Sequence, residues 1–178
     1  EGEVRLKVEA IGLNRAEVLF RQGLYLETPQ LPSRIGYEAA GVVDAVGGGV
    51  GNVKVGDRVS TIPSFAMGKY GVYGESAIVP AQAVTAYPDN LSAVEGAAIW
   101  MQYLTAYGAL VAIGKMKPAH AVLITAASSS VGLAAIQIVK AAGALAIATT
   151  RGPSKKEYLR SAGADHVIVT DAEDLAQQ

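Results

Sequence analysis

The chain has 178 residues, 51% of them hydrophobic, so it is long enough to bury a core in one domain or in two small ones. Its net charge is −1 and only 17% of its residues are charged, which argues against a nucleic-acid-binding surface or a polybasic membrane surface. It has no cysteine, which excludes disulfides, thiolate zinc sites and a cysteine nucleophile.

No apolar run approaches the length of a bilayer-spanning helix, and there is no charged-then-apolar signal peptide. We therefore expect a soluble, cytoplasmic protein with no membrane partner and no nucleic-acid partner. The two histidines, His120 and His166, lie too far apart for a recognisable metal motif. The chain begins with Glu1 rather than Met and enters a strand pattern at once, so we expect that it has lost its natural start.

The first half of the chain has the period-two pattern of strands. Hydrophobic residues at 4, 6, 8 and 10 alternate with charged ones, which predicts a strand with one wet face. "AGVVDAVG" (40–47) and "GESAIVP" (74–80) predict further short strands, with glycine turns between them. "NRAEVLFRQG" (14–23) has helical spacing and ends at a glycine. These segments predict a small β-rich domain.

The rhythm changes near residue 91. Ser92 and Glu95 have the spacing of a capping box ahead of one long apolar helix over 91–110. "AVLITA" (121–126) is a continuous apolar run, which predicts a parallel strand covered on both faces.

A helix–strand–helix–strand pattern follows that first parallel strand. "VGLAAIQIVKAAG" (131–143) predicts a helix and "ALAIATT" (144–150) a second strand. Ser154 and Glu157 have the spacing of another capping box, for a helix that ends at Gly163, and "HVIV" is the third strand. Alternating strands and helices of this kind predict the first half of a doubly wound nucleotide-binding sheet.

The turn between the first strand and helix lacks the usual early glycines. Ser128, Ser129 and Ser130 occupy it, and only Gly132 remains. The serines are small enough to let the backbone approach a pyrophosphate, and the glycine lets the helix pack close to the strand. Free N–H groups and the helix dipole favour an anion there. An N-capped helix with no ligand explains the same residues, so the turn alone leaves both readings open.

The end of the second strand bears on which dinucleotide would bind. An NAD site is expected to carry a carboxylate there, about 20 residues after the turn, to bind the ribose. The segment "ATTRGPSKK" has none, and instead supplies Arg151, Lys155 and Lys156. A guanidinium and a nearby ammonium suit a 2′-phosphate, which favours NADP(H). The alternative is a solvated basic helix start, although positive charge is slightly unfavourable at that end of a helix.

Six segments in this order make the chain similar to a known family. They are "VEAIGLNRAEVLFRQGLY", "GYEAAGVVDAVG", "VKVGDRV", "YLTAYGAL", "SVGLAAIQIVKAAGA" and "LRSAGADHVI". Together they resemble the zinc-independent, quinone-oxidoreductase-like branch of the medium-chain dehydrogenase/reductase superfamily. The resemblance implies an α/β chain with a GroES-like β-barrel substrate domain over 1–97 and the N-terminal half of an NADP-binding Rossmann domain over 98–178. The second half of that Rossmann domain is missing, so we expect a truncated chain that would be a homodimer at full length.

The resemblance also bears on metal chemistry. Zinc-dependent relatives hold the metal with Cys, His and Cys, at positions that match Asn14, Tyr37 and Met101. An amide, a phenol and a thioether are not the ligands that zinc prefers. We therefore expect chemistry without zinc. Hydride transfer to a quinone or an α,β-unsaturated carbonyl fits, because neutral hydrogen-bond donors can stabilise the resulting enolate or phenolate.

The family likeness implies roles for individual residues. Asn14 would lie near the nicotinamide and give an N–H to the substrate oxygen, and Thr105 would bind the carboxamide. Tyr25 and Tyr37 are weaker catalytic candidates. The predicted cofactor-binding residues are Asn14, Thr105, Ser128, Ser129, Ser130, Val131, Gly132, Arg151 and Lys155. Each has a plainer explanation: Asn14 as a helix N-cap, Thr105 bonded to a backbone carbonyl, and Tyr37 as packing, with neighbouring Glu38 serving structure or an ion pair.

The sequence thus predicts an NADPH-dependent, metal-free reductase of a quinone or enone. Two alternatives stay open. One is a zinc-free alcohol or aldehyde reductase of the same fold. The other is a non-catalytic NADPH-binding sensor or structural protein.

Overall fold

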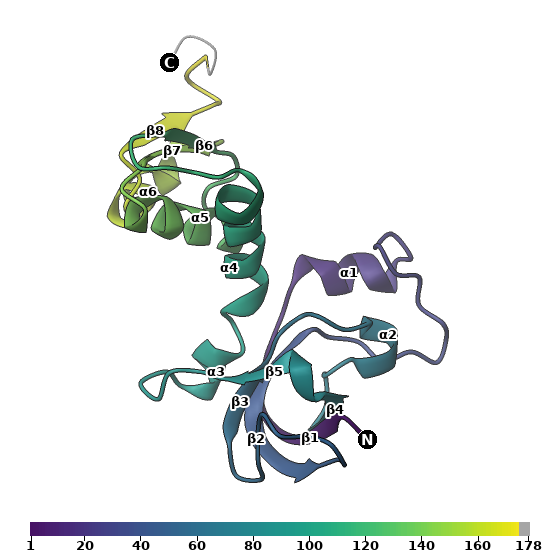
Figure 1. Ribbon diagram of the computed structural model, residues 1–178. Helices are drawn as coiled ribbons and strands as arrows, with labels where there is room; N and C mark the ends of the chain where they lie inside the picture. The colour runs from purple at the N-terminus through teal and green to yellow at the C-terminus, as the bar shows by residue number, and fades with distance from the viewer. Residues whose placement is uncertain (175–178) are drawn as a thin grey trace. The chain divides into compact units, whose positions relative to one another are not determined.

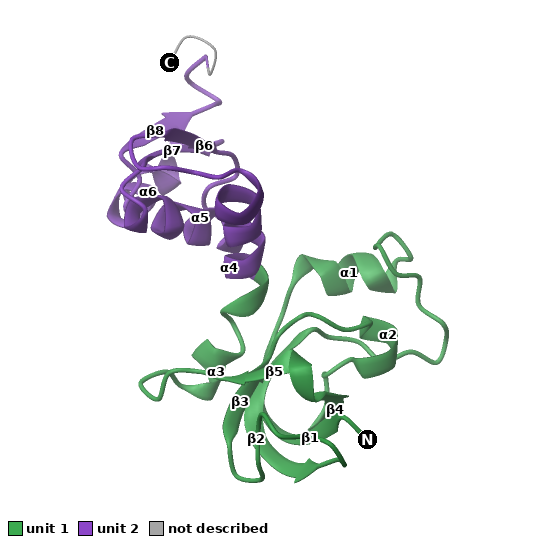
Figure 2. Ribbon diagram, in the orientation of Figure 1, with its two compact units in different colours: residues 1–101 green, residues 102–178 purple. Residues whose placement is uncertain are grey.

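The computed structural model describes residues 1–174, and the chain divides into two compact units. Unit 1 is Glu1–Met101 and unit 2 is Gln102–Gln178 (Figure 2). Antiparallel pairing is confined to unit 1 and parallel pairing to unit 2 among the described residues. The predicted fold class is therefore confirmed: a β-rich domain followed by a partial doubly wound sheet.

Unit 1 is built on a five-stranded antiparallel sheet in the order β4-β1-β2-β3-β5 (Figure 1). In β1, Val4 and Leu6 are buried while Arg5 and Lys7 face outward, as the alternation predicts. The register between β1 and β2 shifts twice, and such bulges bend and twist a strand pair. The strands are β1 (Glu3–Gly12), β2 (Glu38–Val46), β3 (Arg58–Thr61), β4 (Ser76–Pro80) and β5 (Val84–Ala86).

Short helical segments join these strands. The predicted helix after residue 14 is α1 (Arg15–Arg21), which buries Phe20 in a core cluster with Tyr37 and Met67. The others in unit 1 are α2 (Met67–Tyr70), η1 (Ala81–Ala83) and α3 (Ala93–Gly96). The main core of the unit is made largely of buried valines, which come mostly from strands β1, β2, β3 and β4.

The prediction of one long helix from residue 91 to 110 is wrong. The Ser92–Glu95 capping box is present, with the Ser92 backbone N–H donating to Glu95 Oε2 over 2.8 Å, but α3 ends at Gly96. A new helix, α4 (Trp100–Tyr107), begins after a turn and runs into a π-helical segment, η2 (Gly108–Ile113). The interruption has a physical cause, because the first N–H groups of α4 donate to a buried carboxylate rather than to α3 (see below).

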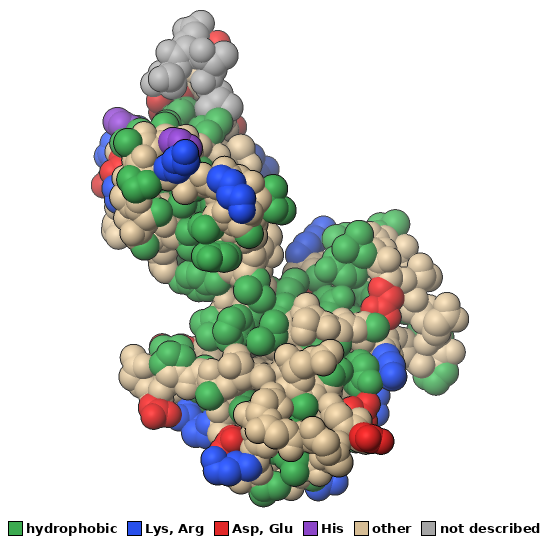
Figure 3. Space-filling view, viewed as in Figure 1, with side chains coloured by type: hydrophobic (Ala, Val, Ile, Leu, Met, Phe, Trp, Pro, Cys, Tyr) green, Lys and Arg blue, Asp and Glu red, His purple; other side chains and the backbone are tan. Residues whose placement is uncertain are grey.

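The run from Ala93 to Ile113 has a mean hydropathy of 1.3 and is long enough, by length and composition alone, to cross a membrane. The expectation that no apolar run approaches this length is therefore wrong. Only 17% of the run's apolar window is buried inside the structure. Hydrophobic side chains are visible on the face of unit 2 that Figure 3 shows. One such run is a weak sign, since core helices and signal sequences meet the same test.

Unit 2 has a three-stranded parallel sheet in the order β6-β7-β8 (Figure 1). The strands are β6 (Ala121–Ile124), β7 (Leu145–Thr150) and β8 (His166–Val169), and α5 (Ser130–Ala141) and α6 (Lys156–Ser161) connect them. Small buried residues of β7, Ala146 and Ala148, pack in one core with Ile136 and Val139 of α5. Small residues let α5 pack close to the sheet, so the N-terminus of α5 lies near the carboxyl ends of the strands.

Two local predictions in unit 2 are wrong. The first strand was expected to be covered on both faces, yet β6 is an edge strand that pairs only with β7 among the described residues, and its Leu123 is 49% exposed. The helix expected to start with a Ser154–Glu157 capping box is preceded by a 3₁₀ turn, η3 (Pro153–Lys155), which draws Ser154 into it. Proline at the first helical position makes that earlier start favourable.

Candidate functional site

A pocket of about 620 Å³ opens at the carboxyl ends of all three parallel strands. Parallel strands end at the same edge of a sheet, so residues far apart in sequence meet there. The lining residues are Ala126, Ser128, Ser129, Thr149, Thr150, Arg151, Gly152, Ser154, Lys155, Thr170 and Asp171. The pocket lies entirely within unit 2.

The turn that leads into α5 forms one wall of this pocket. Ser129 is the N-cap, and its Oγ accepts the Gly132 backbone N–H over 3.1 Å. A Cβ added at Gly132 would lie 2.5 Å from the backbone oxygen of Ala127, so only glycine fits without moving the chain. Ser130 and Val131 are exposed first-turn residues of α5 outside the pocket lining.

Ala126 was not predicted to be special, yet it has φ 47°, in the left-handed region that favours glycine. This backbone conformation reverses the chain after β6. Alanine carries no compositional signal for such a turn, so nothing in the sequence could have identified it.

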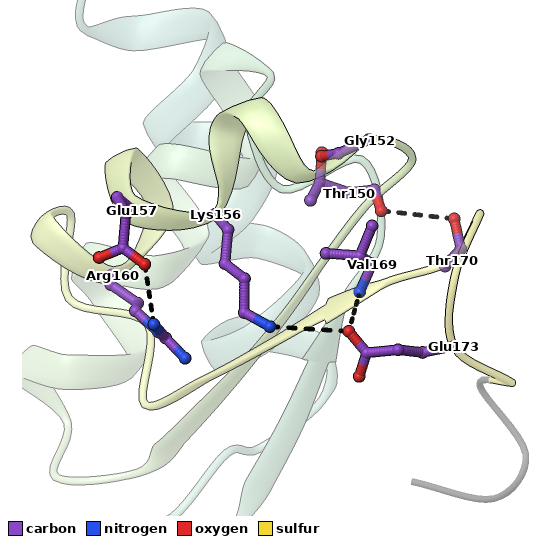
Figure 4. A network of polar contacts seen from close by, with 8 residues as sticks. All are labelled: Thr150, Gly152, Lys156, Glu157, Arg160, Val169, Thr170 and Glu173. Atoms are coloured by element: carbon purple, nitrogen blue, oxygen red, sulfur yellow. Dashed lines mark hydrogen bonds and ion pairs between the residues drawn. The ribbon is translucent and has the colours of Figure 1, made fainter.

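The basic residues after β7 differ in where they point. Arg151 and Lys155 line the pocket, and Lys155 Nζ donates to Ser128 Oγ over 3.2 Å. Lys156 lies outside the lining and forms an ion pair with Glu173 at 3.7 Å (Figure 4). The structure therefore places Lys155, and not Lys156, beside the serine turn.

The pocket also includes polar residues that the sequence reasoning missed. Thr149 and Thr150 are buried at the end of β7, and Thr170 and Asp171 follow β8. The Asp171 backbone N–H donates to the Arg151 carbonyl over 3.1 Å. Their position after β8 is the signal that could have identified them. Residues that follow adjacent parallel strands lie at the same edge of the sheet, so the end of the third strand was as relevant as the end of the second.

This set of groups fits a phosphorylated nucleotide. It combines serine hydroxyls, a guanidinium and an ammonium in the lining of a single pocket, where Ser129 caps the N-terminus of α5. Helix N-termini and Arg–Lys pairs are common phosphate-binding groups.

A second group of predicted residues lies in unit 1, around Asn14. Asn14 is the N-cap of α1, and its backbone N–H donates to Glu17 Oε2 over 2.8 Å. Its side-chain Nδ2 donates to Glu38 Oε2, also over 2.8 Å. The N-cap explanation for Asn14 is thus correct as local structure, since its side chain faces the Glu17 backbone N–H in a capping box, and its amide nitrogen has a further partner in Glu38.

Glu38 is 1% exposed, and the groups bonded to its carboxylate within residues 1–174 are N–H donors, which fits the structural one of the two roles expected for it. Its Oε1 accepts the backbone N–H groups of Trp100 over 2.8 Å and of Met101 over 2.9 Å. A carboxylate at a helix N-terminus stabilises the helix, which explains why α4 begins at this point.

Tyr37 is buried, and Tyr25 packs edge-on against it with ring centroids 6.3 Å apart. Burial, followed by the nearby Tyr25 and Glu27, raises the pKa of Tyr37 to about 12. Burial also raises the pKa of Tyr73, which donates its hydroxyl to the Gly12 carbonyl over 2.8 Å. Both phenols therefore keep their protons at neutral pH.

Thr105 lies on α4 in unit 2, and its side chain is exposed. The roles predicted for Asn14, Thr105, Tyr25 and Tyr37 in catalysis or cofactor binding remain predictions. Among residues 1–174 there is no group of three or more acidic or histidine side chains placed to hold a metal ion.

Comparison with known proteins gives two family matches. Residues 1–89 match the alcohol dehydrogenase GroES-like domain, and residues 130–178 match the family described as zinc-binding dehydrogenase. The chain is 39% identical over 167 residues to the synaptic vesicle membrane protein VAT-1 homolog of Mus musculus, covering 94% of this chain and 40% of that protein. It is 36% identical over 176 residues to a quinone oxidoreductase of Pseudomonas aeruginosa, covering 99% of this chain and 53% of that protein.

A solved structure of Escherichia coli quinone oxidoreductase complexed with NADPH is similar with a TM-score of 0.90 and 37% sequence identity. The match covers 99% of this chain and 53% of that one. The chain thus spans about half the length of the relatives it matches.

Proposed function

We propose a function from one premise: the chain belongs to the medium-chain dehydrogenase/reductase superfamily, in its quinone-oxidoreductase-like branch. The proposed function is NADPH-dependent, metal-free reduction of a quinone or an α,β-unsaturated carbonyl. The observation that carries it is the unit 2 pocket, where Arg151 and Lys155 lie beside the serine turn. Residues 1–97 would serve as the substrate domain and 98–178 as half of the cofactor domain.

Unit 2 residues would hold the cofactor. The serine turn and the N-terminus of α5 would bind its pyrophosphate, and Arg151 with Lys155 would bind the 2′-phosphate. Lys155 is already held at the turn through Ser128, so it needs little reorganisation to meet a phosphate. A bound nicotinamide supplies the hydride, and Thr105 would orient its carboxamide.

Unit 1 residues would stabilise negative charge on the substrate. Asn14 Nδ2 carries two hydrogens and uses one for Glu38, so one N–H is left to donate to a substrate oxygen. The amide, phenol and thioether of Asn14, Tyr37 and Met101 make a poor zinc site, which supports a neutral donor in place of a metal. A pKa of about 12 makes Tyr37 a reluctant proton donor, so solvent is the better source of the proton.

The cofactor assignment is tested by binding, because every pocket residue lies in unit 2. Arg151→Asp should raise the Kd for NADPH by about tenfold or more, since it replaces a charge-assisted contact with repulsion. The Kd for NADH should change little. Lys117→Asp is the matched control: it makes the same charge change in unit 2 at an exposed residue outside the pocket. Equal losses for both cofactors with Arg151→Asp would overturn the 2′-phosphate assignment.

A second function has support from one relative. The Mus musculus protein is named for a vesicle membrane and not for a reaction, which keeps a non-catalytic NADPH-binding protein in view. Turnover with paired enone and saturated-ketone substrates separates the candidates. Reduction of the enone supports our proposal, reduction of the saturated ketone alone favours an alcohol or aldehyde reductase, and tight NADPH binding without turnover favours the non-catalytic protein.

The remaining expectations also stand as proposals. They are a cytoplasmic location, a homodimer, and no zinc, membrane or nucleic-acid partner.

A further inference from the structure

We propose that Glu38 is a positioning residue whose buried carboxylate fixes the orientation of the Asn14 side-chain amide, and so decides which hydrogen-bonding atoms Asn14 offers to a substrate. This inference rests on the proposed function for its consequence in catalysis. Its structural part, the fixed amide, stands on hydrogen bonds within unit 1.

The two ends of an asparagine amide have nearly the same shape, so packing barely distinguishes them, and hydrogen-bond partners decide which end points where. Glu38 makes that choice here. Its Oε2 lies 2.8 Å from Asn14 Nδ2, and an ionised carboxylate only accepts hydrogen bonds, so only the nitrogen end can face it.

Glu38 itself is held in place from the other side. Its Oε1 accepts from Trp100 and Met101 at the start of α4, and the side chain is almost completely buried. Gly12 of β1 closes the remaining space, since a Cβ there would lie 2.9 Å from Glu38 Oε2 and 2.8 Å from its Cβ. A carboxylate fixed by two backbone donors and a close backbone is a rigid reference for Asn14.

A second carboxylate has a different task. Glu17 is also buried, but it accepts the backbone N–H groups of Asn14 over 2.8 Å and of Tyr37 over 3.2 Å. Glu17 thus fixes where the Asn14 backbone lies, and its own backbone N–H faces the oxygen of the Asn14 side chain in the capping box. Glu38 holds the nitrogen end of the same amide through a charge-assisted bond of 2.8 Å. The two roles can be separated by mutation.

Glu38→Gln tests the orientation with almost no change in volume. The glutamine oxygen can still accept from the start of α4, but its nitrogen then meets the nitrogen of Asn14, and two donors cannot bond. Rotating the Asn14 amide by half a turn restores the bond to residue 38, gives up the capping contact of the Asn14 oxygen with the Glu17 backbone N–H, and exchanges the donor and acceptor that remain. We expect the Asn14 side-chain NH₂ signals in ¹⁵N–¹H spectra of the chain to shift and to lose protection from exchange with solvent.

The same variant should lower kcat for enone reduction by about tenfold to a hundredfold, because the donor to the developing oxyanion is displaced. The KM for NADPH should stay within about twofold, because the unit 2 pocket that would bind the phosphates of the cofactor is unchanged. Unchanged Asn14 NH₂ signals, or unchanged kcat, would overturn the proposal. If the parent chain shows no turnover at all, the proposed function fails, while the NMR result still decides the orientation.

The double variant Asn14→Asp with Glu38→Gln separates positioning from stability, and it decides the matter if Glu38→Gln alone does not fold. It exchanges carboxylate and amide across the same hydrogen bond, so the bond and the melting temperature should return. Turnover should remain low, because residue 14 then has no N–H to give. If the double variant recovered both its melting temperature and its turnover, the Asn14–Glu38 pair would serve stability alone, and the proposal would be overturned.

Discussion

The charged side chains of the two candidate sites differ in burial. In unit 1, Glu17, Glu38, Ser60 and Thr61 are each at most 4% exposed, and the two glutamates and Thr61 are bonded to backbone groups. In unit 2, Thr149 and Thr150 are buried at the carboxyl end of the sheet, while the charged residues there, Arg151 and Lys155, are exposed. Buried polar groups need hydrogen-bond partners within the protein, while exposed ones are solvated and remain available to a ligand.

This difference indicates how each unit can contribute to function. Unit 1 offers a rigid arrangement whose geometry is set before any ligand arrives. Unit 2 offers charge and hydroxyl groups whose partners come from outside. Substitutions should therefore cost folding free energy in unit 1 and ligand affinity in unit 2, and departures from that rule are informative.

The largest departure from this rule is expected at Gly132, in the first turn of α5, where a substitution in unit 2 should cost folding free energy. Gly132→Ala should lower the free energy of unfolding by about 3 kcal/mol, because the new Cβ meets backbone atoms that cannot move aside. Gly152→Ala is the control, since it lines the same pocket with nothing within 4 Å of the added Cβ, and it should change stability by less than about 1 kcal/mol. Denaturant unfolding measures both, and similar values would show that the turn is not tightly packed.

A matched pair of threonines tests the comparison directly. Thr61 Oγ1 accepts from the Ala39 N–H and donates to the Tyr37 carbonyl, each over 2.8 Å, in a fully buried site. Thr61→Val keeps the shape but leaves both groups unpaired, so it should cost about 2 kcal/mol. Thr170→Val in unit 2 removes one bond of 3.4 Å at an exposed residue and should cost about 0.5 kcal/mol or less. Equal costs in urea titrations would break the proposed contrast.

Two neighbouring lysines provide the affinity test. Lys155→Ala should raise the Kd for NADPH about tenfold and leave stability nearly unchanged, because it removes a pocket ammonium. Lys156→Ala removes a partly exposed ion pair with Glu173 and should leave the Kd within about twofold. Calorimetric titration distinguishes them, and the reverse ranking would mean that the phosphate lies elsewhere.

The smallest effect at neutral pH is the alkaline titration of Tyr37. Its folded-state pKa of about 12 exceeds the ordinary value of 10.0, because burial disfavours the phenolate. The unfolded chain loses this proton first, so stability is unaffected below pH 10 and falls as the pH rises from 10 to 12. Tyrosinate absorbance should show a late-titrating group that Tyr37→Phe removes. Loss of a group that titrates near pH 10 would contradict this assignment.

Much of the site was predictable because its signals are local. The serine turn follows β6 directly and the basic residues follow β7 directly, so their meeting at one pocket follows from strand–turn–helix order and from the shared edge of parallel strands. Asp171 and Thr170 were missed because they join the pocket only through the pairing of β8 with β7. Ala126 was missed because its φ of 47° is imposed by the fold and not by its side chain.

The sequence by itself determined the order of strands and helices, the absence of thiolate chemistry and the run of positive charge after β7, because periodicity, composition and adjacency are properties of neighbouring residues. Only the tertiary structure decided where α4 begins and which way Asn14 faces. Both depend on Glu38, whose partners lie 24 residues before it and 62 residues after it. A buried carboxylate needs donors, and the folded chain alone brings them within reach.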